Sequence, residues 1–377
     1  MRWGRTATVA AVGTGAAVVG AGAAALVAGR VVSDYSVRPG GGSPAAAGGL
    51  RVHSVAAGQV ELTRSWETQR PGRYGLEWSG GRAVVGAVVA TGAQTVTRRL
   101  ESVQTLGGSP LAVGSTVRIT PQLFTGDPLG SLGLEFSEIE VPGELGPLPA
   151  WFLPGARALC LIAVHGGLDR RQVLPLLPLL DQLKVPVLAV TYRNDEGAPR
   201  SPDGLSHLGD SEWHDVDAAI RFALDGGARR IVLLGWSAGA TMALQAAVRS
   251  EHRAAVRGLV LDSPVLDWRG TVRRRATRRG VPPFLAELGV RAALGRSGVD
   301  PERLDRAALG EGLDAPVLLL HGSDDTVAPV GPARRLAGRR DDLVIYEEFP
   351  DAEHEALWNA DPARYEESLR RFLTPLL

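Results

Sequence analysis

The chain has one cysteine, one lysine and no net charge. Because Cys160 is the single cysteine, an internal disulfide is excluded. Its apolar neighbours Leu159 and Leu161 indicate a core position rather than a nucleophile. Basic and acidic residues are equal in number, 41 of each, and Lys184 is the only lysine. This balance gives no charge signature for a nucleic-acid partner.

The first long feature is an uncharged run, residues 6–29, between Arg5 and Arg30. Its length fits a membrane-spanning helix better than the shorter apolar core of a cleaved signal peptide. Positive charge before the run, at Arg2 and Arg5, favours a cytoplasmic N-terminus and an extracytoplasmic body. The sequence predicts a membrane anchor at residues 1–30. A secreted protein released from a cleaved signal is the alternative.

Two further segments precede the main body. Residues 31–50 are rich in glycine and alanine and predict a flexible linker. Residues 51–137 contain short β segments separated by turns such as Arg70-Pro71-Gly72, and they predict a small β-rich accessory domain with no catalytic arrangement. The strands expected there are 60–66, 74–78, 83–90, 95–100 and 117–120.

From residue 138 to the C-terminus, the pattern changes to alternating strands and helices. A hairpin is expected at 139–142 and 149–153, followed by strands at 159–164, 185–191, 231–234, 258–261, 316–320 and 343–347. The expected helices are 173–183, 213–224 and 362–373. Such alternation predicts an α/β domain with a mostly parallel, doubly wound sheet.

The stretch around Ser237 organises this domain. Residues 231–234 are apolar throughout, as in a parallel strand that is covered on both faces. Gly235-Trp236-Ser237-Ala238-Gly239 follows, and helix-forming residues come next. This G-x-S-x-G pattern is typical of a nucleophile elbow, where small residues allow a sharp turn that exposes the serine hydroxyl. The alternative is an ordinary glycine-rich loop between a strand and a helix.

A serine nucleophile needs an imidazole to accept its proton and a carboxylate to orient that imidazole. His354 is the candidate base, because it lies in a polar loop after the last predicted strand. His321 is the competing histidine, but its position at a strand end favours a structural role. Asp325 is the candidate acid.

These motifs resemble the α/β-hydrolase superfamily over residues 138–377. The resemblance rests on His165-Gly166-Gly167, the elbow at Ser237, the run from His321 to Pro329, and Asp351-Ala352-Glu353-His354. Within the superfamily, the last two are similar to loops of the branch that includes prolyl-oligopeptidase-type, esterase and bacterial membrane-anchored hydrolases. The implied order of triad residues is Ser, Asp, His.

The resemblance also implies the remaining site residues. It places the acid at Asp325, with Asp324 adjacent and with Asp262 or Asp267 as the position used in some relatives. The expected oxyanion hole has the backbone N–H of Ala238 as one donor and that of Gly167 or Leu168 as the other. His165 is expected to brace this loop.

A cap is predicted at about 268–312, between two strands of the sheet. It begins with an arginine-dense stretch, which indicates either a solvated helix face or a surface for anionic lipid or substrate. Phe284, Leu285, Leu288 and Ala292 follow at helical spacing.

We therefore expect a serine hydrolase that acts on small-molecule or lipid-like carboxylic esters through an acyl-enzyme at Ser237. It would use neither a metal nor an organic cofactor. A peptidase and an acyltransferase of the same fold are alternatives. The peptidase is disfavoured because residues 51–137 are too few for the propeller domain of prolyl-oligopeptidase relatives. A binding protein without catalysis is a further alternative, although such proteins usually lack a triad residue.

Overall fold

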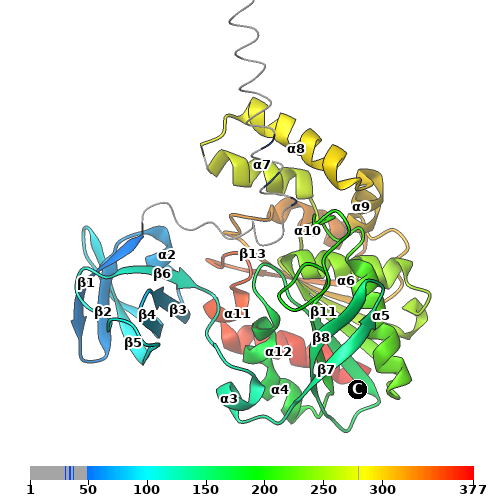
Figure 1. Ribbon diagram of the computed structural model, residues 1–377, viewed down its shortest axis with the longest axis horizontal. Coiled ribbons are helices and arrows are strands. Elements are labelled where there is room, and N and C mark those ends of the chain that lie inside the picture. The colour runs from blue at the N-terminus through cyan, green and yellow to red at the C-terminus, as the bar shows by residue number, and fades with distance from the viewer. Residues whose placement is uncertain (1–29, 31–33, 35–36, 38–48, 279) are drawn as a thin grey trace, which may run out of the picture.

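The computed structural model describes residues 30, 34, 37, 49–278 and 280–377. The predicted anchor at residues 1–30 and the predicted linker at residues 31–50 lie almost entirely outside this part of the chain. Among the described residues, no helix combines the length and the apolarity needed to cross a bilayer. Two bodies are visible in Figure 1, a small barrel and a larger α/β domain beside it.

The α/β domain is built on a sheet whose eight strands, within the described residues, run in the order β14-β13-β12-β11-β9-β10-β8-β7. Strands β9 to β14 pair in parallel, and β8 joins them antiparallel through β10. The strands are β7 (Ser137–Gly143), β8 (Gly146–Leu153), β9 (Leu159–Val164), β10 (Val187–Val190), β11 (Arg230–Trp236), β12 (Val256–Asp262), β13 (Val317–Gly322) and β14 (Val344–Phe349). The expected α/β-hydrolase sheet is therefore confirmed.

Helices cover both faces of this sheet. Helices α5 (Trp213–Asp225), α6 (Ser237–Arg249) and α10 (Val330–Arg339) pack on one face, and α4 (Leu177–Gln182), α11 (Leu357–Ala360) and α12 (Pro362–Leu373) pack on the other. Strand β9 is buried along its whole length because it lies between these layers. Burial also raises the pKa of the Cys160 thiol to about 12, in keeping with a core cysteine.

One predicted helix differs from expectation. Residues 173–183 do not form a continuous α-helix: a 3-10 helix spans Arg170–Leu176 and α4 follows from Leu177. Pro175 and Pro178 lack the N–H groups that an α-helix would use there, so the tighter helix takes the first half.

The accessory region forms a closed barrel with strand order β1-β2-β5-β4-β3-β6. Its strands are β1 (Leu50–Ala56), β2 (Gln59–Thr63), β3 (Tyr74–Trp78), β4 (Gly81–Thr91), β5 (Thr95–Thr105) and β6 (Thr116–Thr120). Strand β1 was not predicted, because Val52 is its only fully buried residue and no apolar alternation marks it. The expected β-rich domain is confirmed.

The strand predicted at 60–66 was too long at its C-terminal end. Strand β2 ends at Thr63, and helix α2 (Trp66–Gln69) begins after two intervening residues. Ser65 and Thr68 form a capping box: the Ser65 hydroxyl accepts from the Thr68 N–H at 3.2 Å, and the Thr68 hydroxyl accepts from the Ser65 N–H at 2.8 Å. Trp66 therefore lies on a helix outside the barrel wall.

The insertion between β12 and β13 folds into helices α7 (Trp268–Arg278), α8 (Pro283–Ser297) and α9 (Pro301–Ala308). Figure 1 shows α7 and α8 above the rest of the α/β domain. The apolar residues noted at helical spacing are not all buried: Phe284 is 69% exposed and Leu288 39%. The buried face of α8 instead carries Ala286, Gly289 and Ala293, because small side chains let α7 and α8 approach closely.

A buried ion pair fixes the long connection after β10. The Arg193 guanidinium donates to Asp215 on α5 at 2.8 Å through Nε and at 2.8 Å through Nη2. The Arg193 backbone N–H donates to the same carboxylate at 2.7 Å. Both side chains are almost fully buried, so neither charge can be hydrated if its partner is lost.

We expect Arg193→Met to lower the free energy of unfolding by about 3–5 kcal/mol, because it leaves the Asp215 carboxylate buried without its cation. Chemical denaturation measures this loss. Arg334→Met is the matched control: Arg334 is exposed and pairs with Glu348 at the surface, so its loss should lower the free energy of unfolding far less. Equal losses in the two variants would contradict the buried-pair argument.

Candidate active site

Ser237 is the first residue of α6 and follows β11 directly. Its φ of +50° is the left-handed conformation that a nucleophile elbow requires. A Cβ at Gly235 would lie 2.5 Å from the Ala240 Cα, and a Cβ at Gly239 would lie 2.2 Å from the Val164 carbonyl oxygen. Both glycines of the pattern are therefore required by close backbone approach.

Ser237, His354 and Asp325 form a continuous hydrogen-bonded chain. The Ser237 Oγ lies 2.7 Å from His354 Nε2, and His354 Nδ1 lies 2.7 Å from Asp325 Oδ2. His354 comes from the loop after β14, and Asp325 comes from the loop after β13. The structure thus brings together the three residues that the sequence predicted as nucleophile, base and acid.

Asp325 is held from several sides. Its Oδ1 accepts from the backbone N–H of Val327 at 2.8 Å and of Ala328 at 2.7 Å. The fully buried His321 places Nε2 3.2 Å from Oδ2, so this histidine supports the acid loop. Asp324, the adjacent carboxylate, is exposed and accepts from the Ser323 hydroxyl at 3.4 Å.

The other acid candidates have different partners. Asp262 is fully buried at the end of β12 and accepts from the Ser263 hydroxyl at 2.8 Å, and burial raises its pKa to about 7. Asp267 caps α7 by accepting from the Gly270 N–H at 2.8 Å. The carboxylate that contacts His354 is that of Asp325.

Charge and burial oppose each other in the Asp325–His354 pair. Burial raises the pKa of Asp325, but the charges and hydrogen bonds of His354 and His321 outweigh it and hold that pKa well below its usual range. Burial lowers the pKa of His354, but the neighbouring Asp325 carboxylate outweighs it and holds the pKa above the ordinary value for histidine. The pair therefore favours imidazolium next to carboxylate.

The predicted oxyanion donors flank Ser237. Ala238 is in the first turn of α6, where N–H groups have no intrahelical acceptor. The Gly167 N–H donates to Glu355 Oε1 at 2.9 Å. A Cβ at Gly166 would lie 1.8 Å from the same Glu355 oxygen, so glycine is needed where this carboxylate enters. Leu168, the other candidate, lines a cavity of about 30 Å³ beside Trp236 and Glu355.

His165 braces the loop that carries Gly167. Its Nε2 lies 2.8 Å from Asp195 Oδ2, and its ring stacks on Tyr192 with centroids 4.6 Å apart. The Tyr192 hydroxyl donates to the Gly166 carbonyl at 3.0 Å. These contacts fix the loop, as expected for a structural histidine.

Two glutamates next to His354 were missed as functional residues. Glu353 Oε1 accepts from the Thr326 N–H at 2.9 Å and from its hydroxyl at 2.5 Å, which ties the histidine loop to the acid loop. Glu355 contacts Gly167, as described above. The sequence placed both carboxylates beside the candidate base, but their partners lie in distant segments and carry no local signal.

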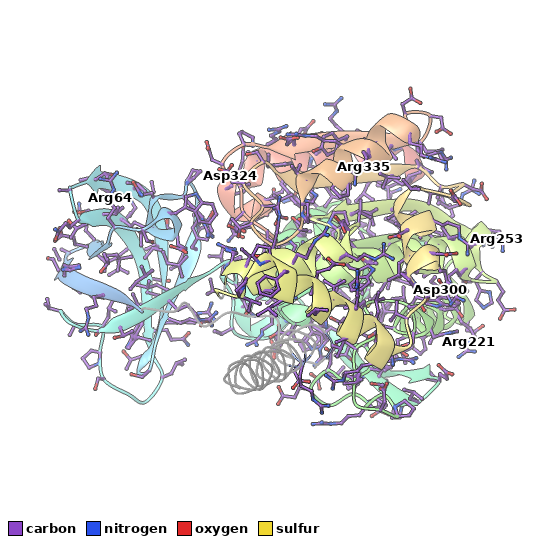
Figure 2. The ribbon with its side chains drawn as sticks, turned by 90° about the horizontal axis from the view of Figure 1, so that it is seen from above. Arg64, Arg221, Arg253, Asp300, Asp324 and Arg335 are labelled. Atoms are coloured by element: carbon purple, nitrogen blue, oxygen red, sulfur yellow. The ribbon has the colours of Figure 1, made fainter. Side chains whose placement is uncertain are left out.

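A cavity of about 860 Å³ opens between the barrel, the cap and the acid loop. Trp66 of the barrel lines one side and the acid loop, residues 323–326, another. In Figure 2 the labelled Asp324 marks this loop, at the edge of the α/β domain that faces the barrel. Of the arginine-dense stretch, the cavity wall includes Arg273, Arg274 and Arg278.

These arginines also contact the acid loop. Arg274 donates to the Asp325 carbonyl at 3.1 Å, and Arg278 donates to the Thr326 carbonyl at 3.3 Å. The stretch is therefore more than a solvated helix face. Within the described part of the chain, no cluster of His, Cys, Asp or Glu is arranged to hold a metal ion.

The fold and the Ser237 elbow define an α/β hydrolase, and the comparison with known families agrees. The chain belongs to the alpha/beta hydrolase family, whose sequence profile matches residues 161–368. A domain of unknown function (DUF8805) matches residues 51–120, which coincide with the barrel. A search of curated proteins finds no match.

Solved structures share the fold. An esterase from Pyrococcus furiosus is 20% identical with a TM-score of 0.55, and the match covers 68% of this chain and 96% of the esterase. A second crystal form of that esterase, also 20% identical, covers 68% and 98% with a TM-score of 0.53. A third crystal form is 19% identical, covers 68% and 95%, and has a TM-score of 0.53. Likeness at this identity shows the fold alone.

Glu355 accepts the hydrogen bond of the Gly167 N–H, which is a candidate oxyanion donor. A substrate carbonyl must therefore displace the Glu355 carboxylate before it can use this N–H. We expect Glu355→Ala to raise kcat/KM about threefold to tenfold, because the freed N–H no longer exchanges one acceptor for another. Glu355→Gln retains an acceptor oxygen of the same reach and should give a smaller gain. A fall in kcat/KM in Glu355→Ala would show instead that the carboxylate assists the reaction.

The raised pKa of His354 predicts a pH profile. Activity requires neutral His354, so kcat/KM should rise with pH. The midpoint of this acid limb should lie above the ordinary histidine pKa of about 6.5. Asp325→Asn removes the anion that stabilises imidazolium, so the limb should move to lower pH while kcat falls by about 10⁴. Asp267→Asn is the control and should change kcat less than about threefold. A severe loss in Asp267→Asn with little loss in Asp325→Asn would move the acid role to Asp267.

Proposed function

We propose that this chain is a serine hydrolase that cleaves carboxylic esters through an acyl-enzyme on Ser237. One observation carries the proposal: Ser237 Oγ lies 2.7 Å from His354 Nε2, and Asp325 lies 2.7 Å from the other ring nitrogen. A serine in this arrangement can lose its proton to the imidazole as it attacks, which is what makes it nucleophilic.

The proposed reaction proceeds in two halves. His354 Nε2 accepts the Ser237 proton while Oγ bonds to the ester carbonyl carbon, and the carbonyl oxygen becomes an oxyanion facing the N–H groups of Ala238 and Gly167. The imidazolium then protonates the leaving alkoxide, which departs as an alcohol. A water molecule repeats the sequence on the acyl-enzyme, releasing a carboxylic acid and restoring Ser237.

Asp325 has a separate role in this scheme. Its carboxylate keeps the proton on His354 Nδ1, so that Nε2 is free to accept from serine, and it stabilises the imidazolium formed in each half. The backbone N–H groups of Val327 and Ala328 fix the other carboxylate oxygen, which limits rotation of the acid.

Esters are favoured over peptides for two reasons. The accessory barrel spans residues 50–120 and is too small to enclose the site as a propeller would. The similar structure from Pyrococcus furiosus is an esterase.

We expect a fluorophosphonate probe to label the purified full-length protein at Ser237, because the phosphorus centre reacts only with an activated serine. Mass spectrometry of the labelled peptide identifies the site. Ser237→Ala removes the acceptor atom, and His354→Ala leaves the hydroxyl without its base. Since triad residues act as a unit, each variant should lose nearly as much hydrolysis as the double variant.

A panel of ester, thioester and peptide substrates separates the alternatives. Preferential ester hydrolysis supports the proposal, and faster peptide cleavage would replace it with a peptidase. Transfer of the acyl group to an added alcohol in preference to water would indicate an acyltransferase. A folded wild-type protein that takes no label and cleaves none of these substrates would leave a binding role for the same fold.

A further inference from the structure

The loop of the barrel that faces the α/β domain is fixed from within by a buried arginine. Arg98 on β5 is fully buried, and its guanidinium donates to backbone carbonyl oxygens of α2 and of the α2–β3 loop. The distances are 3.0 Å to Thr68, 2.7 Å to Arg70 and 2.7 Å to Gly72. Because a buried guanidinium must keep its acceptors, it restricts this loop to one conformation.

The same loop docks on the segment that follows His354. The Asn359 carbonyl accepts from the Arg73 N–H at 3.0 Å, and Asn359 Nδ2 donates back to the Arg73 carbonyl at 2.8 Å. Gly72 has a φ of +94°, and a Cβ there would lie 1.9 Å from the Asn359 carbonyl oxygen. Asn359 also donates to the Pro121 carbonyl at 2.8 Å, so it contacts both the α2–β3 loop and the segment that follows β6.

Arg70 extends from this fixed loop to Glu353, the neighbour of His354. Its Nη2 lies 3.3 Å from Glu353 Oε2, and both side chains are about nine-tenths buried, with exposures of 11% and 9%. The Arg70 guanidinium also stacks on the Trp66 ring, 3.8 Å from its centroid. The other Glu353 oxygen is the one bound by Thr326, next to Asp325.

The geometry points to a role for the barrel in catalysis, and we propose that Arg70 is a positioning residue that holds the His354 and Asp325 loops in register through Glu353. This inference rests on the proposed serine hydrolase mechanism. Arg70 would touch neither substrate nor the reacting atoms. It would act by keeping two loops from different strands at the separation that the His354–Asp325 hydrogen bond needs.

Two readouts separate positioning from simple docking of the domains. Displacing the base by a fraction of an ångström lowers the rate of the chemical step, while substrate affinity depends on other contacts. Removing one member of the pair also changes the charge next to His354. When Arg70 is removed, the unpaired Glu353 carboxylate stabilises the His354 imidazolium. When Glu353 is neutralised, the unpaired Arg70 cation destabilises it.

The remaining charged groups near the pair are unaltered in the experiment. Those interacting with His354 are Asp325, Glu355, Arg275, Asp262 and, through Asp325, His321. Those interacting with Arg70, besides Glu353, are Tyr74, Glu67 and Arg278.

The experiment compares kcat, KM and the pH profile of ester hydrolysis in full-length variants. We expect Arg70→Met to lower kcat about tenfold to a hundredfold with KM changed less than about twofold. Its acid limb in kcat/KM should move to higher pH. Glu353→Gln should move the limb to lower pH, because the anion beside His354 is gone. The double variant should return the limb towards the wild-type position and lose no more kcat than Arg70→Met alone.

Arg118→Met is the matched control. Arg118 is exposed and pairs with Glu77 on the barrel, and neither residue is among the groups that interact with Arg70 or His354, so the variant should keep wild-type kcat and pH profile. Arg70→Lys retains the cation and should recover part of the lost kcat. If Arg70→Met fails to fold, the Lys variant and Glu353→Gln still test the two charges separately.

The inference is overturned if Arg70→Met melts at a lower temperature but keeps wild-type kcat and pH profile. The Arg70–Glu353 contact would then serve only to dock the two domains. Shifts of the acid limb in the same direction for Arg70→Met and Glu353→Gln would overturn the inference as well. A wild-type protein that neither hydrolyses esters nor takes the phosphonate label would instead contradict the proposed function, which is a distinct result.

Discussion

The parallel direction of β11, β13 and β14 within one sheet is the constraint on which the site depends. Parallel strands present their carboxyl ends at the same edge, so the loops that follow them must meet there. Ser237 and His354 are 117 residues apart and His354 and Asp325 are 29 apart, yet both pairs of side chains are 2.7 Å apart. Strand order, rather than proximity in sequence, brings them into contact.

The elbow adds a local constraint to this global one. A φ of +50° at Ser237 costs backbone energy, and the cost is tolerated because β11 and α6 are packed into the core on either side. Gly235 and Gly239 then let the turn lie against neighbouring backbone. The result is a hydroxyl held at the end of a helix, where the backbone N–H of Ala238 faces the same space.

Carboxylates surround the imidazole with different functions. Asp325 is neutralised by His354 and by backbone N–H groups, whereas Glu353 is neutralised by Arg70 of the barrel. Glu355 accepts from the Gly167 N–H. The site is therefore assembled from both domains, and the barrel contributes charge and shape to it through its α2–β3 loop.

The sequence by itself determined the elements and the local geometry of the nucleophile. The G-x-S-x-G spacing, the apolar strand before it and the order of the histidine and aspartate loops depend on rules that act over a few residues. The α/β fold follows from alternation of strands and helices for the same reason. Strand β1 was not predicted because only one of its residues is buried, which leaves no apolar alternation. The interruption of the helix at 170–182 was not predicted because its two prolines act against an otherwise helical pattern.

Only the tertiary structure decided which groups touch the triad. The three candidate acids are all aspartates, and the structure distinguishes them by their partners. Asp262 contacts Ser263, Asp267 caps the start of α7, and Asp325 contacts His354. The contact of Arg70 with Glu353 spans 283 residues, and no local pattern encodes it. Which residues of α8 are buried likewise depends on how closely α7 packs against it. Contacts of this kind arise from the joint packing of several elements, which a one-dimensional pattern does not contain.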